Sequence, residues 1–362
     1  MKQKFYSLKN ILKKQAQYNM IFGERSNGKT YAALKYGLEQ YCERGKQMAI
    51  LRRWREDFIG KRGTVMFDAL VSNGEISKLT GGEWDSVHYY ASKWYLKKTV
   101  PGDKAVIADD PFAYGFSITS MEHDKSTSYP KVTTIVFDEF LTRSAYVPDE
   151  FVLFMNTIST IVRHRTDVTI FMLGNTVNRY CPYFKEMGLT HIKEMRPGDI
   201  DVYRYGDSEL KVAVEYTKPN KQGKESDLYF AFDNPKLSMI TGGAWEIDVY
   251  PHCPVKYAPK DILFTYFISF SGEMLQAEIV QKDGMAFTFI HRKTTDLKDP
   301  DTDVIFSPDP DPRPNHFMRI TAPRTPLGKR IAEFYLKDKI FYQDNEVGEV
   351  VRNYLIWCRN NS

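Results

Sequence analysis

The first half of the chain alternates short apolar runs with amphipathic stretches. Runs of strand length occur at 18–22 (YNMIF), 48–53 (MAILRR), 133–137 (TTIVF) and 169–175 (TIFMLGN). Two stretches have helical spacing and fall between strands, TYAALKYGLEQY at 30–41 and PDEFVLFMNTISTIVRHR at 148–165. Apolar strands separated by helices predict a mainly parallel sheet that is covered on both faces.

The pattern changes along the rest of the chain. Residues 79–120 are rich in aromatic residues and in alternating apolar and polar positions, which predicts strand hairpins or a meander. The polar stretch at 217–227 (TKPNKQGKESD) predicts a loop or linker. Beyond it we expect strands at 262–270, 274–280 and 285–292. A proline-rich connector is expected at 307–315, and two amphipathic helices are expected at 326–338 and 346–358. These patterns predict an α/β domain over 1–200, a linker or lid region over 201–244 and a smaller α+β domain over 245–362.

Length and composition fit this division. A chain of 362 residues is long enough for two domains, and 42% hydrophobic with 27% charged residues is the balance of a globular protein. The formal net charge of +4 is small, so any contact with nucleic acid must come from local patches. The basic N-terminus has no long apolar core or cleavage site, and no segment is apolar over a membrane-spanning length.

Residues 23–30 (GERSNGKT) match the phosphate-binding pattern G-x-x-x-x-G-K-[ST] at every fixed position. The glycines permit a loop that wraps a phosphate with backbone N–H groups, and the following helix points its positive end at the same anion. In this pattern the lysine reaches the β- and γ-phosphates and the threonine hydroxyl binds Mg²⁺. No guanine-recognition motif is present, which favours ATP over GTP. The expected nucleotide-binding residues are Gly23, Glu24, Arg25, Ser26, Asn27, Gly28, Lys29 and Thr30.

The run TTIVFDEF at 133–140 ends an apolar strand with two carboxylates. Ligands bind at the carboxyl ends of strands in open α/β sheets, so these acids are expected beside the phosphate loop. Asp138 would hold Mg²⁺ through its water shell, and Glu139 would polarise the attacking water as general base. A surface turn with two solvated acids is the alternative.

An adjacent Asp-Glu pair is typical of P-loop ATPases with a catalytic glutamate. These enzymes insert an extra strand between the phosphate-loop strand and the acidic strand. The run at 169–175 suits that extra strand, and Asn175 at its end is then a candidate sensor of the γ-phosphate or the attacking water. A turn residue whose side chain bonds to the backbone is the alternative reading of Asn175.

Several arginines are candidates for contacts outside the chain. Arg163 and Arg165 end the helix that follows the acidic strand, where ring ATPases place an arginine that completes a neighbour's site. Solvated arginines at a helix C-terminus are the alternative. The segment RRWREDFIGKR interleaves cations with aromatic residues, so it is either a phosphate-binding stretch or a solvated helix face. The candidate DNA contacts are Arg52, Arg53, Arg55 and, in the loop after the acids, Arg143.

The order and spacing of several segments resemble the DNA-packaging ATPase of phi29-type short-tailed phages. These segments are IFGERSNGKTYA, LRRWRED, KSTSYPKVTTIVFDEF, VRHR and GNTVNRYCPYF. The resemblance covers the first half well and extends weakly into the final helices. It implies a P-loop ATPase that works as a homopentameric ring and drives double-stranded DNA through a portal into a preformed procapsid.

The resemblance also assigns residues. It gives the roles of Walker lysine, metal-linked acid and catalytic acid to Lys29, Asp138 and Glu139. Arg163 matches the family's trans-acting arginine finger, and Lys125 matches a second trans-acting basic residue. The loop after the acids is shorter here than in the family, which weakens the case for Arg143 as the DNA-gripping residue.

The C-terminal domain of that family has an RNase H-like fold without nuclease activity. A nuclease of that fold needs an acid on its first central strand to share two metal ions. The strand 262–270 has none, and Glu273 lies in the turn beyond it. The remaining candidates crowd a proline-rich loop, and they are Asp301, Asp303, Asp309 and Asp311. We therefore expect a docking domain that faces the portal or a packaging RNA.

The expected cofactors are ATP and Mg²⁺. The expected partners are double-stranded DNA, the portal and further copies of the chain, with a packaging RNA as an additional candidate and no membrane. The expected location is the host-cell cytoplasm, with transient docking on the procapsid. Two alternatives stay open: a helicase- or recombinase-type ring ATPase, and a non-enzymatic assembly protein with nucleotide-gated binding. An intact Glu139 argues against the second.

Overall fold

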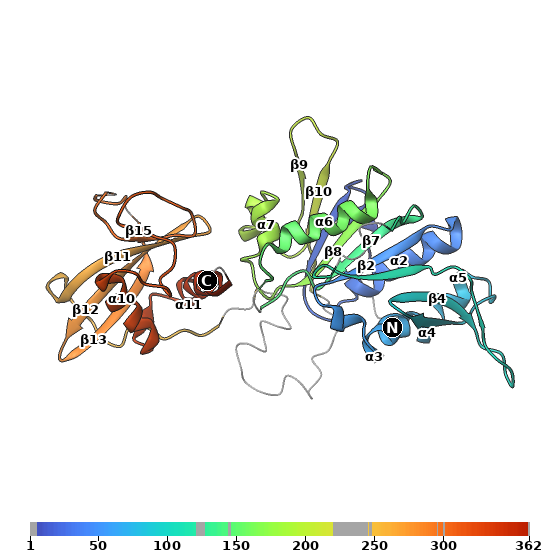
Figure 1. The fold of residues 1–362 in the computed structure, drawn as a ribbon, viewed down its shortest axis with the longest axis horizontal. Helices are drawn as coiled ribbons and strands as arrows, with labels where there is room; N and C mark the ends of the chain where they lie inside the picture. The colour runs from blue at the N-terminus through green and yellow to red at the C-terminus, as the bar shows by residue number, and fades with distance from the viewer. Residues whose placement is uncertain are drawn as a thin grey trace. The chain divides into compact units, whose positions relative to one another are not determined.

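The computed structural model describes residues 6–120, 127–143, 146–219, 245, 248–294, 296–299 and 301–360. The chain divides into two compact units (Figure 1). Unit 1 contains Met1–Arg143 and Asp149–Trp245, and unit 2 contains Ser144–Pro148 and Glu246–Ser362. In the described part of the chain, no helix is both long and apolar enough to cross a membrane.

Unit 1 is built on one large sheet with the strand order β3-β4-β6-β2-β7-β8-β1-β10-β9, with β5 paired to β4. The strands from β6 to β10 in this order are parallel to one another. They are β6 (Ala113–Ser117), β2 (Gln47–Arg52), β7 (Val132–Asp138), β8 (Thr169–Asn175), β1 (Tyr18–Gly23) and β10 (Lys211–Tyr216). The antiparallel strands at the edges are β3 (Ser86–Tyr90), β4 (Lys93–Lys98), β5 (Val106–Ile107) and β9 (Ile200–Arg204). The predicted mainly parallel sheet is confirmed.

Helices cover both faces of this sheet because its strands are apolar on both sides. On β7, Val136 joins the core cluster that includes Ala33 of α2 (Lys29–Arg44). The next residue, Phe137, points to the other face and stacks on Phe154 of α6 (Glu150–Val162), with ring centroids 5.2 Å apart. The other helical elements among the described residues of unit 1 are α1 (Lys9–Leu12), η1 (Arg55–Phe58), α3 (Lys61–Thr64), η2 (Val65–Phe67), α4 (Asp68–Ser72), α5 (Glu75–Leu79), α7 (Pro182–Glu186) and η4 (Thr190–Lys193).

The predicted extra strand is present, because β8 lies between β1 and β7. The register pairs Gly23 with Asn175 and Asp138 with Leu173. The carboxyl ends of these three parallel strands therefore meet at one edge of the sheet.

The predicted boundary at residue 200 is wrong. The strands β9 and β10, in the region interpreted as a linker, form a hairpin whose second strand pairs with β1. Val212 and Val214 are buried there, so β10 completes the hydrophobic core of unit 1. The rest of the predicted linker, from residue 220 to 244, lies outside the described residues.

Unit 2 has its own sheet with the order β15-β14-β11-β12-β13-β16. Its centre is an antiparallel meander of β11 (Ile262–Phe270), β12 (Glu273–Lys282) and β13 (Met285–Arg292). Parallel strands extend the meander on both sides, and they are β14 (Ile305–Phe306), β15 (His316–Phe317) and β16 (Ile340–Tyr342). A short 3-10 turn, η5 (Pro259–Asp261), precedes β11.

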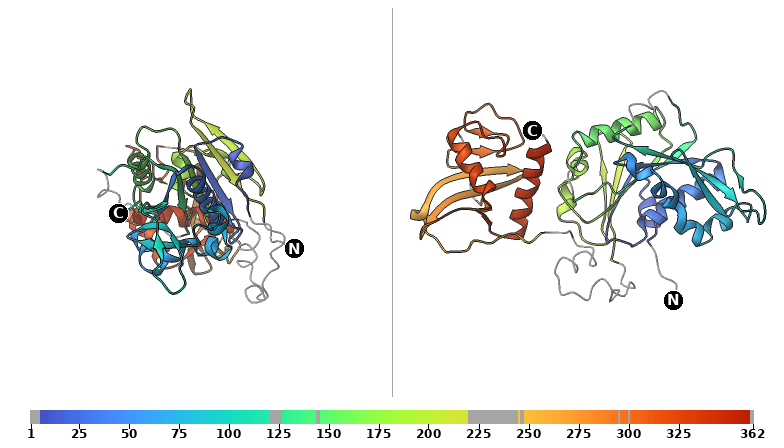
Figure 2. Two further views of the ribbon diagram at one scale, coloured as in Figure 1. Left: turned by 90° about the vertical axis from the view of Figure 1, so that its right-hand side faces the viewer. Right: turned by 60° about the horizontal axis from the view of Figure 1, so that its bottom comes forward.

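In the described part of unit 2, two helices flank the sheet, α10 (Pro326–Leu336) and α11 (Asn345–Asn360). Thr325 caps α10 by accepting a hydrogen bond from the Gly328 amide, and Pro326 stands at the first helical position, as helix starts favour. Figure 2 shows α11, in dark red, beside the meander strands in orange, and α11 contacts β11, β13 and β16. The strands and helices predicted beyond residue 245 are thus formed close to their expected positions.

Candidate nucleotide-binding site

The phosphate loop connects β1 to α2. Gly28, directly before the helix, has φ = 93°, and Ser26 has φ = 58°. Glycine adopts the first of these conformations without steric cost, which explains its place in the motif. The amino end of the 16-residue helix α2 therefore faces a cavity of about 260 Å³ at the carboxyl edge of the sheet. The cavity is lined by Ser26, Asn27, Gly28, Lys29, Thr30, Tyr31, Asp138, Glu139, Leu173, Gly174 and Asn175.

Lys29 lines this cavity and is buried. Its ammonium donates to the Glu24 carbonyl at 2.6 Å, to Asn27 Oδ1 at 3.2 Å and to Asn175 Oδ1 at 3.4 Å. Burial lowers the pKa of Lys29 to about 8, because desolvation outweighs the opposing effects of Asp138 and Glu24. A cation at this depth is suited to bind an anion that enters the cavity.

Thr30 and Asp138 lie together, as the predicted Mg²⁺ site requires. The Thr30 hydroxyl donates to Asp138 Oδ1 at 3.0 Å. Mg²⁺ is commonly held by one or two protein oxygens together with substrate phosphates and water, so this pair beside the phosphate loop fits the ion. Among the described residues, no group of three or more His, Cys, Asp or Glu side chains could hold a metal ion without such help.

The two acids at the end of β7 share one arginine. Arg52 contacts Asp138 Oδ2 at 2.7 Å and Glu139 Oε2 at 2.8 Å. Asp138 is buried, whereas the Glu139 side chain is 68% exposed and its backbone has a left-handed φ of 62°. The candidate general base therefore projects from a strained turn toward solvent. Arg52 belongs to this site, which differs from its predicted role as a DNA contact.

Arg53 also departs from its predicted role, because it is buried and cannot reach a DNA phosphate. Its guanidinium binds both oxygens of Glu150, at 2.7 and 2.8 Å, and donates to the carbonyls of Phe140 at 2.9 Å and Glu139 at 3.3 Å. Tyr183 donates to the same Glu150 carboxylate at 2.9 Å. This bonding fixes the backbone that carries Glu139 to the first turn of α6. Arg52 and Arg53 separate because side chains alternate between faces at the end of a strand.

Removing Arg53 alone is expected to destabilise unit 1 strongly. In Arg53→Met the fully buried Glu150 carboxylate would lose its counter-ion, which typically costs about 3–5 kcal/mol. The double variant Arg53→Met/Glu150→Gln should recover a large part of that loss. Thermal unfolding measures both, with the exposed Arg62→Met as the control that should melt like the parent. Equal melting temperatures for the single and double variants would contradict the proposed pairing.

The other predicted residues lie at different places. Asn175 reaches the site, since its side chain accepts from Lys29, which favours the sensor reading over a simple turn residue. Arg143 donates to the Val177 carbonyl at 3.0 Å, so its guanidinium is bonded to the segment that follows β8. Arg55 is exposed in η1. Arg163 is exposed after α6, where it donates to the Thr127 carbonyl at 3.1 Å. Lys125 lies outside the described residues.

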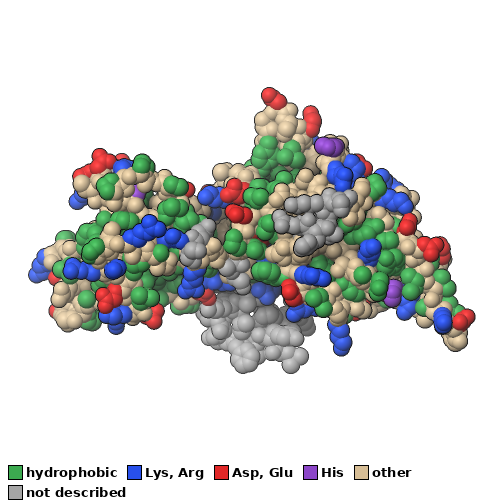
Figure 3. All heavy atoms as spheres, in the orientation of Figure 1, with side chains coloured by type: hydrophobic (Ala, Val, Ile, Leu, Met, Phe, Trp, Pro, Cys, Tyr) green, Lys and Arg blue, Asp and Glu red, His purple; other side chains and the backbone are tan. Residues whose placement is uncertain are grey.

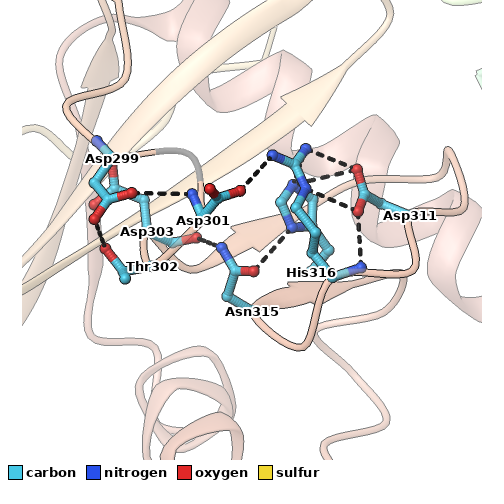
Figure 4. Close-up of polar contacts among 8 residues, drawn as sticks. Asp299, Asp301, Thr302, Asp303, Asp311, Asn315 and His316 are labelled. Carbon is cyan, nitrogen blue, oxygen red and sulfur yellow. Dashed lines mark hydrogen bonds and ion pairs between the residues drawn. The ribbon is translucent and has the colours of Figure 1, made fainter.

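Three of the candidate acids of unit 2, Asp301, Asp303 and Asp311, are bonded to neighbouring residues of the same region (Figure 4). Arg313 binds Asp311 at 2.8 Å and Asp301 at 3.5 Å, and its contact lowers the pKa of Asp311. Asp299 accepts from the Thr302 hydroxyl at 2.7 Å. β11 carries no acid along its length. This arrangement ties the loop together and gives no support for two-metal chemistry.

Comparison with known proteins agrees with the sequence motifs. Residues 86–239 match the model of the family described as Podovirus DNA encapsidation protein (Gp16). The "DNA packaging protein" of Bacillus phage PZA is 22% identical, over 88% of this chain and 87% of that protein. The protein of the same description from Bacillus phage phi29 is 22% identical, over 79% of each chain.

Two solved structures have the same fold over nearly the whole chain. A chain of the bacteriophage Phi-29 viral genome packaging motor assembly matches with a TM-score of 0.60 and 18% identity, over 99% of both chains. A chain of the Phi-28 gp11 DNA packaging motor matches with a TM-score of 0.52 and 20% identity, over 98% of both. The resemblance that the motifs indicate is therefore confirmed: in sequence and in fold, this chain is similar to the DNA packaging proteins of phi29-type phages.

Proposed function

We propose that the protein is an ATP-driven motor that moves double-stranded viral DNA through the portal into a preformed procapsid. The observation that carries the proposal is the meeting of Lys29, Thr30, Asp138, Glu139 and Asn175 around one cavity at the carboxyl ends of adjacent parallel strands. A phosphate loop alone would support any nucleotide-binding protein, whereas a base beside it supports hydrolysis. The similarity to DNA packaging proteins supports the coupling to DNA.

Each side chain has a distinct part in the proposed hydrolysis. Lys29 and the amide groups at the start of α2 bind the phosphates, and Asn175 orients the γ-phosphate or the attacking water. Thr30 and Asp138 hold Mg²⁺, which when bound neutralises charge on the phosphate oxygens. Glu139 accepts the proton of the attacking water. Arg52 keeps the two carboxylates in place before the nucleotide arrives.

We propose further that Arg163 acts in a neighbouring subunit. It precedes the amino end of β8, whereas the cavity lies at the carboxyl end of the same seven-residue strand. Such a strand is roughly 20 Å long, so Arg163 is out of reach of the γ-phosphate in its own chain. Its exposure supports a role across an interface, and a head-to-tail ring of subunits would pair it with the next site.

DNA contact is assigned to local groups of cations. In the face drawn in Figure 3, Lys and Arg side chains are interspersed with acidic and apolar ones, without one broad basic band. Arg55 remains a candidate because it is exposed, and Arg143 remains a weaker one because it is bonded to Val177. We propose that unit 2 is an RNase H-like docking domain without a nuclease site, facing the portal or a packaging RNA.

ATP turnover measured against protein concentration, with and without duplex DNA, tests the proposed function. We expect turnover to rise when duplex DNA is added and to depend steeply on protein concentration, because the site is shared between subunits. DNA-independent turnover by an assembled ring would contradict the motor. Separation of a forked duplex would favour the helicase alternative, and the absence of any ATPase activity would favour a nucleotide-gated assembly protein.

A further inference from the structure

A residue of the last strand in unit 1 reaches into the phosphate loop. Thr217 directly follows β10, and its amide donates to the Phe22 carbonyl of β1 at 2.9 Å. Its hydroxyl oxygen accepts a hydrogen bond from Asn27 Nδ2 at 2.9 Å. The packing is so close that a Cβ at Gly23 would lie 2.1 Å from this hydroxyl oxygen. The glycine that opens the motif is therefore required by Thr217 as well as by the phosphate.

Asn27 also bonds to Lys29, so it links Thr217 to the lysine. Its Oδ1 accepts from the Lys29 amide at 3.3 Å and from the Lys29 ammonium at 3.2 Å. Its own carbonyl accepts from the Tyr6 amide at 3.0 Å, and the Tyr6 hydroxyl is bonded to Glu215 of β10 at 2.6 Å. The end of β10 thus holds Asn27 through two routes, one by side chain and one by backbone.

The orientation of the Asn27 amide matters because both of its ends are buried. Asn27 is 4% exposed and Thr217 is 2% exposed, so neither group has water as an easy substitute. With Nδ2 bonded to the Thr217 hydroxyl, Oδ1 must point at the ammonium of Lys29. The reversed amide would turn N–H groups toward that cation, which is unfavourable.

We propose that Thr217 and Asn27 are positioning residues that fix the phosphate-binding conformation of Lys29. The proposal rests on the proposed nucleotide site, and it adds a residue that the phosphate-loop pattern does not contain. Asn27 occupies a variable position of that pattern, and Thr217 lies 190 residues away in sequence. Their contribution should appear as affinity for the nucleotide, because Lys29 binds phosphates in both the ground state and the transition state.

Two substitutions at Thr217 separate positioning from packing. Thr217→Val keeps the shape but leaves Asn27 Nδ2 buried without an acceptor, whereas Thr217→Ser keeps the hydroxyl and loses a methyl group. We expect Thr217→Val to weaken binding of a fluorescent, non-hydrolysable ATP analogue by about tenfold, the effect of one unsatisfied buried donor. Thr217→Ser should stay within about twofold of the parent, and KM for ATP should follow the same order with kcat nearly constant.

A purely structural role would give a different result. The serine variant, with its lost methyl group, would then be as impaired as valine or more so, and that outcome overturns the proposal. Asn27→Ala and the double variant Asn27→Ala/Thr217→Val provide the second test, because Thr217 should have no further effect once Asn27 is absent. Additive losses would also overturn it. A parent protein that binds the analogue but never hydrolyses ATP would contradict the proposed motor while leaving this test intact.

Discussion

Glu139→Gln is expected to reduce ATP hydrolysis by about 10²–10⁴-fold, the usual contribution of a general base, while ATP still binds. The amide has the same shape but cannot accept the proton of the attacking water. Asp138 keeps its contacts with Thr30 and Arg52, so the phosphate-binding part of the site should remain intact. Steady-state turnover and analogue affinity, measured on the same samples, separate the two effects.

Two further variants serve as comparisons for this prediction. Lys29→Ala should lose nucleotide binding together with hydrolysis, since its ammonium is the buried cation of the cavity. Glu209→Gln, an exposed acid in the turn between β9 and β10, should behave like the parent. If Glu139→Gln kept more than about a tenth of the parent turnover, Glu139 could not be the main base.

Arg163→Ala subunits are expected to bind ATP normally and to lose hydrolysis by about 10³–10⁵-fold once assembled. An arginine supplied across an interface stabilises charge that develops only in the transition state, so its loss should leave ground-state affinity unchanged. Arg165→Ala is the matched control, because Arg165 is less exposed than Arg163 and is bonded to the carbonyls of Tyr129 and Ile161 and to the Asp167 carboxylate. It should retain most of the activity.

Mixing two inactive variants shows whether Arg163 acts in its own chain or in the next. An Arg163→Ala subunit keeps its own Glu139, and a Glu139→Gln neighbour still offers its arginine. In a randomly mixed head-to-tail ring, about a quarter of the sites would then be complete, and turnover should reappear. No recovery in a mixture that forms mixed rings would show that the two residues act within one chain.

The features of the site that depend on local sequence pattern and on strand order could be predicted from the sequence. The strands ending in Asp138 and Asn175 are apolar runs with polar ends, and parallel neighbours bring such ends to one edge. The motif at 23–30 likewise predicts the phosphate loop from local sequence alone. These features need no knowledge of contacts between distant side chains.

For the residues that sequence reasoning misassigned or missed, the contacts depend on strand register and on the face of the sheet to which each side chain points. Arg52 and Arg53 are adjacent members of one basic run, yet one binds the acids of the cavity and the other is buried against Glu150. The alternation of side chains along a strand predicts that these two arginines point to opposite faces, but it does not predict the partner of either one. Thr217 is recognisable only once β10 is paired with β1, whereas the sequence alone predicts a linker at these residues.

The separation of Arg163 from the phosphate loop by the length of β8 has a consequence for assembly. Each subunit would carry the nucleotide site on one surface and Arg163 on another, so every contact in the proposed oligomer would join two different surfaces. An open row of such subunits always leaves one site without its arginine and one arginine without a site. Only closure removes both, and a heterologous contact closes only when the angle between neighbours divides a full turn. If Arg163 acts in a neighbouring subunit as proposed, the angle at that interface would decide whether every nucleotide bound by the oligomer can be hydrolysed.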